Sequence, residues 1–379
     1  MKKLLFAAAL CLATHVANAA WHSVLQVSVG AAPSYTGPGD VVSSATAWWS
    51  CSRAYNAAQA TALANACILR AATGTNAGNT KTITVLATGL FDVATANAWA
   101  GTDVSSISCS SATNTLTCTG ASSTPSVGDT FTGSGATQPC FATAVGTFTG
   151  GAGTVTTGGA GCGTIASPVA MVAQGALYAT EAYDQSGALA CSSAACNATE
   201  AVTSEQPEWL PNCVNSQPCL FYNSANSSRL QSPSYTPSAA TKTLSAVGSR
   251  ITGTGLTYLG FIVASDYIGM PATANEWELL GGLGGDTLVT GVADGSFHSG
   301  NGVIDGTSSV FNVDGTEVTG TANGATAASA MYFGRTSGTA TSYESELGLW
   351  NTVLFTQTQR TNMCANQATF YGTTIGTFC

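Results

Sequence analysis

The sequence is poor in charged residues. It holds only 10 Lys and Arg and 19 Asp and Glu in 379 residues, so 8% of the chain is charged, where a soluble domain typically has about 25%. With a net charge of −9, it lacks the clustered basic residues that capture a phosphate backbone, which excludes a nucleic-acid partner. Because 45% of its residues are hydrophobic, the chain has material for a core and is not intrinsically disordered.

Histidine is also scarce. After residues 1–19, the only histidines are His22 and His298. Neither accompanies the Gly-x-Ser-x-Gly elbow of a Ser–His–Asp hydrolase. The cysteines lack the Cys-x₂-Cys or His-rich spacing of a zinc site, and no phosphate loop, dinucleotide fingerprint or EF-hand loop is present. We therefore predict no metal ligands and no cofactor, and carboxylates are the remaining acid/base groups.

Residues 1–19 have the pattern of a secretory signal peptide. Lys2 and Lys3 precede an apolar run at 4–13, and small residues at 16–19 supply a cleavage site. We predict a secreted, extracellular or cell-surface protein, with a virion surface as the alternative. No later run reaches the ~20 apolar residues of a membrane span, so no membrane association is expected after cleavage.

The other cysteines lie in successive twos along the chain, as expected of a disulfide-bonded exported protein. Sequence does not fix connectivity, and the economical hypothesis is sequential pairing. The expected pairs are Cys51–Cys67, Cys109–Cys118, Cys140–Cys162, Cys191–Cys196, Cys213–Cys219 and Cys364–Cys379.

The mature chain divides into a helix and many strands. After a lead-in at 20–44, the Ala-rich stretch 45–70 with Trp48 and Trp49 predicts one helix. Thr/Val alternation broken by Gly, Asn and Asp, as at 81–86 and 312–318, predicts short strands and hairpins.

A nearly charge-free stretch at 105–165 predicts an inserted small β module. This module separates the first part of the main β domain, at 45–104, from its larger second part, at 166–379. The Val-Gly-Asp turn at 127–129, the Gly-Ser-Gly at 133–135 and a Gly-rich hairpin are similar to a module of phage tail and fibre proteins.

Two further resemblances bear on fold. Residues 52–55 (SRAY), 83–92 (ITVLATGLFD), 182–187 (AYDQSG) and 206–207 (QP) resemble, in this order, the catalytic domain of arabinofuranosidase B-type glycoside hydrolases. Residues 294–354 resemble the closing hairpins of a laminin-G or concanavalin A-like jelly roll. The resemblances imply an all-β, concanavalin A-like β-sandwich with one N-terminal helix and the inserted module. A jelly roll of this kind can hold a structural Ca²⁺ through loop oxygens.

The same resemblance implies a site on residues 275–281 (NEWELLG). Glu276 occupies the place of the family's nucleophile, and Glu278 is the alternative if the alignment slips by two residues. The family's acid/base Asp has no counterpart at 334–338, and its adjacent Cys pair is missing. Strand alternation puts Glu276 and Glu278 on one face and Trp277 on the other, and a solvated strand face is an equal interpretation of the two glutamates.

Other residues have a binding and a structural interpretation. Trp277 and Trp209 sit among polar neighbours and are the candidate sugar-stacking rings. Asp184 is a candidate for sugar contact. The sequence Asp-Gln-Ser-Gly also favours a turn in which the carboxylate accepts hydrogen bonds from backbone N–H groups. We expect His298 to be a strand residue and Glu346 to be a fold residue.

These observations favour an exported β-sandwich that recognises a polysaccharide or other glycan and hydrolyses it weakly or not at all. One alternative is an active, retaining α-L-arabinofuranosidase. Another is a structural or adhesive, self-assembling subunit of a surface appendage or phage particle.

Overall fold

The computed structural model describes residues 35–379 apart from short internal gaps and the C-terminal end. The gaps are 159–160, 253–255, 263–265, 272–275, 283–285, 291–294, 337–339 and 374–379. The predicted signal peptide and most of the predicted lead-in lie outside the described residues. No helix among the described residues is long and apolar enough to cross a membrane.

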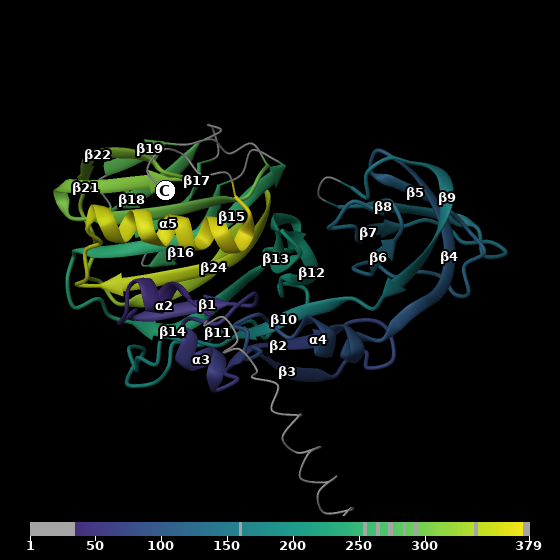
Figure 1. Ribbon diagram of the computed structural model, residues 1–379, viewed down its shortest axis with the longest axis horizontal. Coiled ribbons are helices and arrows are strands. Elements are labelled where there is room, and N and C mark those ends of the chain that lie inside the picture. The colour runs from purple at the N-terminus through teal and green to yellow at the C-terminus, as the bar shows by residue number, and fades with distance from the viewer. Residues whose placement is uncertain are drawn as a thin grey trace, which may run out of the picture. The chain divides into compact units, whose positions relative to one another are not determined.

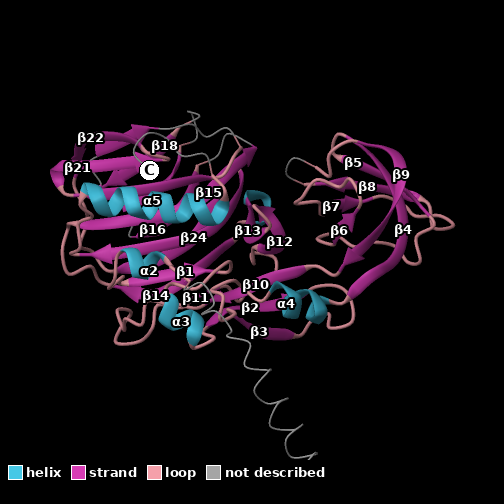
Figure 2. Cartoon of the chain, viewed as in Figure 1, coloured by secondary structure: helices cyan, strands magenta, loops and turns pink. Residues whose placement is uncertain are grey.

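The main body is a sandwich of two antiparallel sheets (Figures 1 and 2). The first sheet runs β3 (Thr80–Thr84), β2 (Asn65–Ala71), β10 (Leu177–Ala182), β12 (Glu208–Val214), β13 (Gln217–Asn223), β24 (Thr341–Asn351), β15 (Lys242–Thr252), β20 (His298–Ile304), β21 (Gly306–Val313) and β22 (Thr316–Ala322), with β1 (Ala47–Ser50) also on β24. The second runs β14 (Arg229–Tyr235), β23 (Ser329–Thr336), β16 (Thr257–Ile262), β17 (Asp266–Met270), β18 (Trp277–Gly281) and β19 (Asp286–Thr290). Strand β11 (Ala198–Thr199) pairs with both β10 and β14 and joins the two sheets. The predicted β-sandwich is therefore confirmed.

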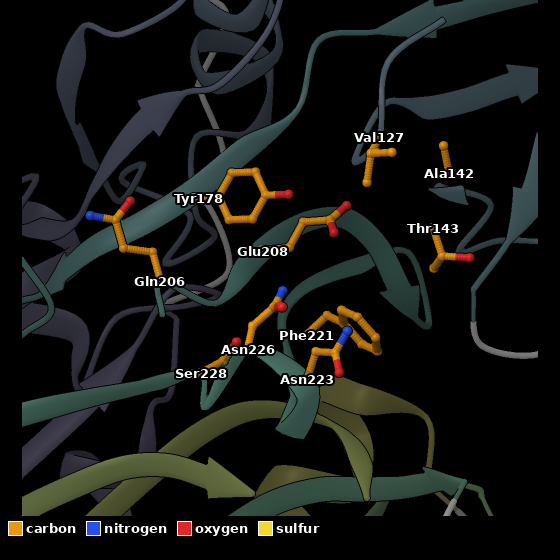
Figure 3. Close-up of a pocket in the computed structure, with 10 residues that line it drawn as sticks. All are labelled: Val127, Ala142, Thr143, Tyr178, Gln206, Glu208, Phe221, Asn223, Asn226 and Ser228. Atoms are coloured by element: carbon orange, nitrogen blue, oxygen red, sulfur yellow. The ribbon is translucent and has the colours of Figure 1, made fainter. Parts of the chain in front are cut away.

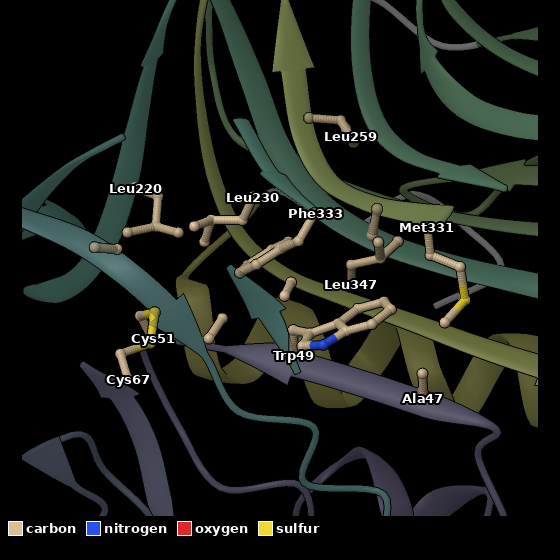
Figure 4. Close-up of a cluster of buried hydrophobic side chains, with 14 of the residues drawn as sticks. Ala47, Trp49, Cys51, Cys67, Leu220, Leu230, Leu259, Met331, Phe333 and Leu347 are labelled. Carbon is tan, nitrogen blue, oxygen red and sulfur yellow. A yellow bond between two sulfur atoms is a disulfide. The ribbon is translucent and has the colours of Figure 1, made fainter. Parts of the chain in front are cut away.

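The inner faces of the two sheets share one hydrophobic core. Figure 4 shows Trp49 of β1 beside Phe333 of β23, whose rings stack with centroids 6.4 Å apart. Leu220 and Leu230 pack into the same cluster from β13 and β14. Burial of these apolar side chains between the inner faces holds the two sheets together. Side chains that alternate with them along each strand point to the outer faces of the sandwich.

The predicted helix at 45–70 is wrong. The segment forms β1, a five-residue helix α3 (Ala57–Thr61) and β2. Trp48 and Trp49 are both buried but belong to different clusters, as strand alternation requires. Asn56 caps the N-terminus of α3. The apolar Ala-rich composition resembled a helix because the strand is buried on both faces and has no polar alternation to mark it.

The remaining helices are α2 (Pro38–Val41), α4 (Val93–Ala100), α5 (Gln357–Tyr371) and a 3₁₀ turn at Ser224–Asn226. Helix α5 begins at a capping box formed by Thr356 and Gln359 and ends at Gly372. Its Gln367 donates to Ser245 of β15 and to Glu346 of β24, so α5 lies on the outer face of the first sheet.

Six strands between Thr102 and Gln174 form a separate sheet. Its order is β6 (Thr130–Gly133), β9 (Ile165–Gln174), β4 (Thr102–Ala112), β5 (Thr115–Thr119), β8 (Gly153–Thr157) and β7 (Ala142–Val145). The unit has its own buried cluster around Phe131, Leu116 and Val155. We call residues 102–174 the insert. A small β module was expected in this part of the chain, and the strands extend past the expected limits at both ends.

Five of the predicted disulfides are confirmed: Cys51–Cys67, Cys109–Cys118, Cys140–Cys162, Cys191–Cys196 and Cys213–Cys219. Cys364 is also disulfide-bonded, and its predicted partner Cys379 lies outside the described residues.

Removal of the Cys51–Cys67 bond by a double alanine substitution should lower the free energy of unfolding by about 3 kcal/mol, because its loop spans 16 residues. Removal of Cys191–Cys196, which spans 5 residues, should cost roughly 1 kcal/mol less. Urea unfolding of the two variants measures both values. An equal loss for the two loops would contradict this loop-length argument.

Candidate functional site

The two glutamates that the sequence offers as alternative catalytic residues have different surroundings in the structure. Glu276 is exposed in a bend just before β18. Glu278 lies within β18, half-buried, and accepts a hydrogen bond of 2.6 Å from the Tyr267 hydroxyl. The burial pattern of β18 turns Trp277 inward and Glu278 outward, as the alternation predicts. Glu278 is thus engaged by a neighbouring strand, whereas Glu276 stands in solvent.

The two tryptophans proposed as sugar platforms lie in the core. Trp277 is 0% exposed and Trp209 is 1% exposed, and both belong to the cluster between the sheets. Trp277 packs edge-to-face against His298, with ring centroids 6.1 Å apart. In this structure neither indole offers a ring face to a ligand, because sheet packing covers it.

Asp184 ties loops together. Its carboxylate accepts hydrogen bonds from the backbone N–H groups of Trp48, Ser186 and Cys196, at 3.0, 3.0 and 3.1 Å. Burial raises the pKa of Asp184, and these donors counter that rise. The geometry is that of the turn interpretation, with the acid connecting β1 to the Cys191–Cys196 loop.

A row of side chains that the sequence does not reveal crosses the outer face of the first sheet. Arg70 of β2 lies opposite Tyr178 of β10, Tyr178 lies opposite Glu208 of β12, and Glu208 lies opposite Phe221 of β13. Phe221 in turn lies opposite Tyr343 of β24. Directly opposed residues of antiparallel strands share a face, so these five residues form one continuous row, which we call the cross-strand row.

The insert packs over the middle of the cross-strand row. Phe141 of the insert packs edge-on against Phe221, with ring centroids 4.9 Å apart. Gly128 approaches Tyr178 so closely that a Cβ at this glycine would lie 2.9 Å from the Tyr178 hydroxyl. Thr73 donates to Asp129 of the insert at 2.8 Å and also binds the backbone N–H of Ala176. The insert is therefore docked on the sheet where the row lies.

A pocket of about 270 Å³ opens between the insert and the row (Figure 3). Figure 3 shows Tyr178 and Glu208 on one side and Val127 and Thr143 of the insert on the other. The lining combines two aromatic rings, amides, hydroxyls and one carboxyl group. The described lining residues are Val127, Ala142, Thr143, Tyr178, Gln206, Glu208, Phe221, Asn223, Asn226 and Ser228.

Glu208 is the unusual group in this pocket. Its residue is 7% exposed, and its Oε1 has no hydrogen-bond partner among the described residues. Burial, assisted by the nearby charge of Asp129, raises the pKa of Glu208 well above its ordinary value. A buried oxygen without a partner costs about 1–3 kcal/mol, and native structures seldom leave one without a reason. Burial therefore favours the neutral form of Glu208, which can donate as well as accept a hydrogen bond.

The junction of insert and sheet holds a second perturbed acid. Burial raises the pKa of Asp129 to about 7, and a hydrogen bond to Asp103 adds to the rise. Ser126 donates its backbone N–H to Asp129 and its hydroxyl to Asp103, at 2.8 and 3.0 Å. Asp129 thus changes its charge near neutral pH at the point where the insert contacts Thr73.

This shift predicts a pH dependence of stability. Because the folded pKa of Asp129 lies above its ordinary value of 3.8, the folded state holds the proton more tightly between about pH 4 and 7. The stabilisation is fully present below that window and is lost as the pH rises through it. Asp129→Asn should flatten the decline in unfolding free energy between pH 4.5 and 7.5 by on the order of 2 kcal/mol. Urea unfolding at several pH values measures this, and equal slopes for both proteins would refute it.

Another buried acid lies on the inner side of β24. Glu344 is 0% exposed, and neither carboxyl oxygen has a hydrogen-bond partner among the described residues. Burial raises its pKa well above the ordinary value. It lines none of the described pockets, and its charge acts on the buried Tyr222. Burial thus favours the neutral form of Glu344 in the core.

The chain matches no protein-family model and no curated protein sequence. Its fold is similar to a GH54 α-L-arabinofuranosidase soaked with a cyclic sulfate inhibitor, at 12% identity and a TM-score of 0.51. It is also similar to a mutant GH54 α-L-arabinofuranosidase soaked with 4-nitrophenyl α-L-arabinofuranoside, at 10% identity and 0.52. A third similar structure is an arabinofuranosidase complexed with arabinofuranosyl-α-1,2-xylobiose, at 11% identity and 0.52.

Each alignment covers 90% of this chain and 67% of the other chain. At such low identity the likeness is one of fold, and at that level the predicted resemblance to arabinofuranosidase B-type domains is confirmed. The comparisons give no support to the phage-module resemblance of the insert, which stays a prediction. The chain is an all-β sandwich with the fold of GH54 arabinofuranosidases.

Proposed function

We propose that the protein is an exported glycan-binding protein and that the pocket around Glu208 is its sugar site. The observation that carries the proposal is Glu208 itself, which lines the pocket and whose buried Oε1 has no hydrogen-bond partner among the described residues. A sugar hydroxyl is a suitable partner because it both donates and accepts hydrogen bonds. Asn223 and Asn226 add amide groups, and Tyr178 and Phe221 add aromatic surface, the combination of polar anchors and apolar walls that ligand pockets use.

Fold and covalent structure support the same proposal. The solved arabinofuranosidases that share the fold were complexed or soaked with arabinofuranosyl ligands. Five disulfides among the described residues fit an oxidising, extracytoplasmic compartment. Export and glycan binding together account for a surface rich in hydroxyls and amides.

Glycoside hydrolysis is the second candidate, favoured by the raised pKa of Glu208, which suits a general acid. The usual mechanism needs a second carboxyl group across the scissile bond, about 5–9.5 Å away. Among the described lining residues Glu208 is the one carboxyl group. Binding with little or no turnover is therefore the function the pocket supports best.

Two measurements on the intact protein test this function. An array of arabinan, arabinoxylan and other plant and bacterial glycans should show saturable binding, quantified by titration calorimetry. Incubation with 4-nitrophenyl α-L-arabinofuranoside should release no nitrophenol above the buffer rate. Failure to bind any glycan would refute the proposal, and steady release of nitrophenol would establish the hydrolase instead.

A further inference from the structure

A second cavity adjoins the Glu208 pocket on the other side of Tyr178. It measures about 290 Å³ and is lined by Arg70, Ala72, Tyr178, Thr203, Ser204 and Asn226. Tyr178 and Asn226 line both cavities. The two cavities therefore lie next to each other along the cross-strand row, one at Glu208 and one at Arg70, and we call them together the groove.

Arg70 is held in place and keeps free donors. Its Nε donates to Gln206 Oε1 at 2.7 Å, and its guanidinium lies 5.3 Å from the centroid of the Tyr178 ring. No hydrogen bond engages its Nη1 or Nη2 among the described residues. A guanidinium stacked on an aromatic ring and fixed through Nε presents its remaining N–H groups in a rigid fork, which matches the two oxygens of a carboxylate.

The two acids near this end of the groove share one basic partner and do not line either cavity. Glu200 and Glu205 are both paired with Arg229, at 3.0 and 2.6 Å, so the three side chains together keep one net negative charge, partly neutralised by the shared guanidinium. At the other end, burial raises the pKa of Glu208 and so favours its neutral form. Among the described residues that line either cavity, Arg70 is the one permanent charge. In a chain with 10 Lys and Arg in all, a cation in a groove is a specific feature.

We propose that the groove binds an acidic glycan: a sugar ring occupies the Glu208 pocket, and the carboxylate of a uronic acid unit binds the Arg70 fork. This inference rests on the proposed function and narrows its ligand class. Thr203, Ser204 and Asn226 line the Arg70 cavity with side chains that are exposed, so they are available to the hydroxyls of the same uronic acid unit.

The test compares a uronic acid-containing xylo-oligosaccharide with its carboxyl-reduced, neutral counterpart, by titration calorimetry at 20 and 300 mM salt. The intact protein should bind the acidic form about tenfold more tightly than the reduced form at low salt, and the preference should shrink at high salt. Arg70→Gln should remove the preference for the acidic form over the reduced form. Arg70→Lys should keep part of it, since the charge remains without the fork.

A charge-matched control is Lys81→Gln. Lys81 is exposed on β3, the strand next to Arg70, and lines neither cavity, so its loss should leave the preference intact. Equal affinity of the intact protein for both oligosaccharides would refute the acidic-glycan proposal and leave glycan binding standing. Binding of neither form would refute both. Because the decisive comparison uses the intact protein, misfolding of an Arg70 variant does not obscure the result.

Discussion

Replacement of Glu346 by alanine is expected to lower the free energy of unfolding by about 3–5 kcal/mol. Arg53 and Glu346 form an ion pair whose side chains are each 1% exposed. The guanidinium binds both carboxylate oxygens, at 2.7 and 2.9 Å. Removal of the acid would leave Arg53 charged and buried without a counter-charge, and that penalty sets the size of the effect.

The pair also fastens helix α5 to the sheet. Gln367 and Tyr371 of α5 donate to Glu346 at 2.7 and 3.1 Å. The Arg53 guanidinium lies 4.5 Å from the Phe370 ring centroid. The loss of Glu346 should therefore loosen α5 together with its partner Arg53. This arrangement confirms the expectation that Glu346 is a residue of the fold.

A double variant separates desolvation from attraction. Arg53→Met with Glu346→Leu removes both charges, and it should be closer in stability to the intact protein than Glu346→Ala alone. Urea unfolding of the three proteins measures the difference. If the single variant were as stable as the intact protein, the assignment of this pair as the central fastening of α5 would be wrong.

Glu208→Ala should weaken glycan binding by about 10- to 100-fold, the value of a hydrogen bond to a buried polar group. Glu208→Gln should retain affinity within about threefold. The reason is that the raised pKa of Glu208 keeps the acid neutral, and an amide is a neutral donor and acceptor of the same shape. Titration calorimetry with one oligosaccharide checks both variants.

The same pair of variants distinguishes binding from catalysis. If Glu208 were a general acid, Glu208→Gln would abolish turnover while sparing affinity. Glu276→Gln is the matched control, since Glu276 is exposed and lines none of the described pockets. A loss of binding in Glu276→Gln with none in Glu208→Ala would contradict the Glu208 site and restore the sequence-based assignment.

Local features of the fold are the ones that the sequence predicts well. The hairpin at 312–318 follows from Asp314-Gly315, whose positive φ angles of 48° and 83° fit a tight two-residue turn. The close spacing of successive cysteines predicts six disulfides because each closes a local loop, and five of them are confirmed. The helix predicted for 45–70 is wrong because a strand buried on both faces has no periodicity to distinguish it from a buried helix.

The pocket could not be predicted because strand register assembles it. Arg70, Tyr178, Glu208 and Phe221 are far apart in the chain, and pairing of β2, β10, β12 and β13 places them in one row. The sequence-based candidate nearest to the pocket was Trp209, chosen for its polar and acidic neighbours. Trp209 packs in the core, whereas the adjacent residue, Glu208, lines the pocket. Alternation within a strand explains that displacement.

A crystal structure of the protein soaked with the tightest-binding oligosaccharide tests the central claim most directly. The account predicts a sugar ring in the cavity between Tyr178, Glu208 and Asn226, with a sugar hydroxyl within hydrogen-bond distance of Glu208 Oε1. A sugar bound instead beside Glu276 and Glu278 at β18, with the Glu208 pocket empty of ligand, would contradict it.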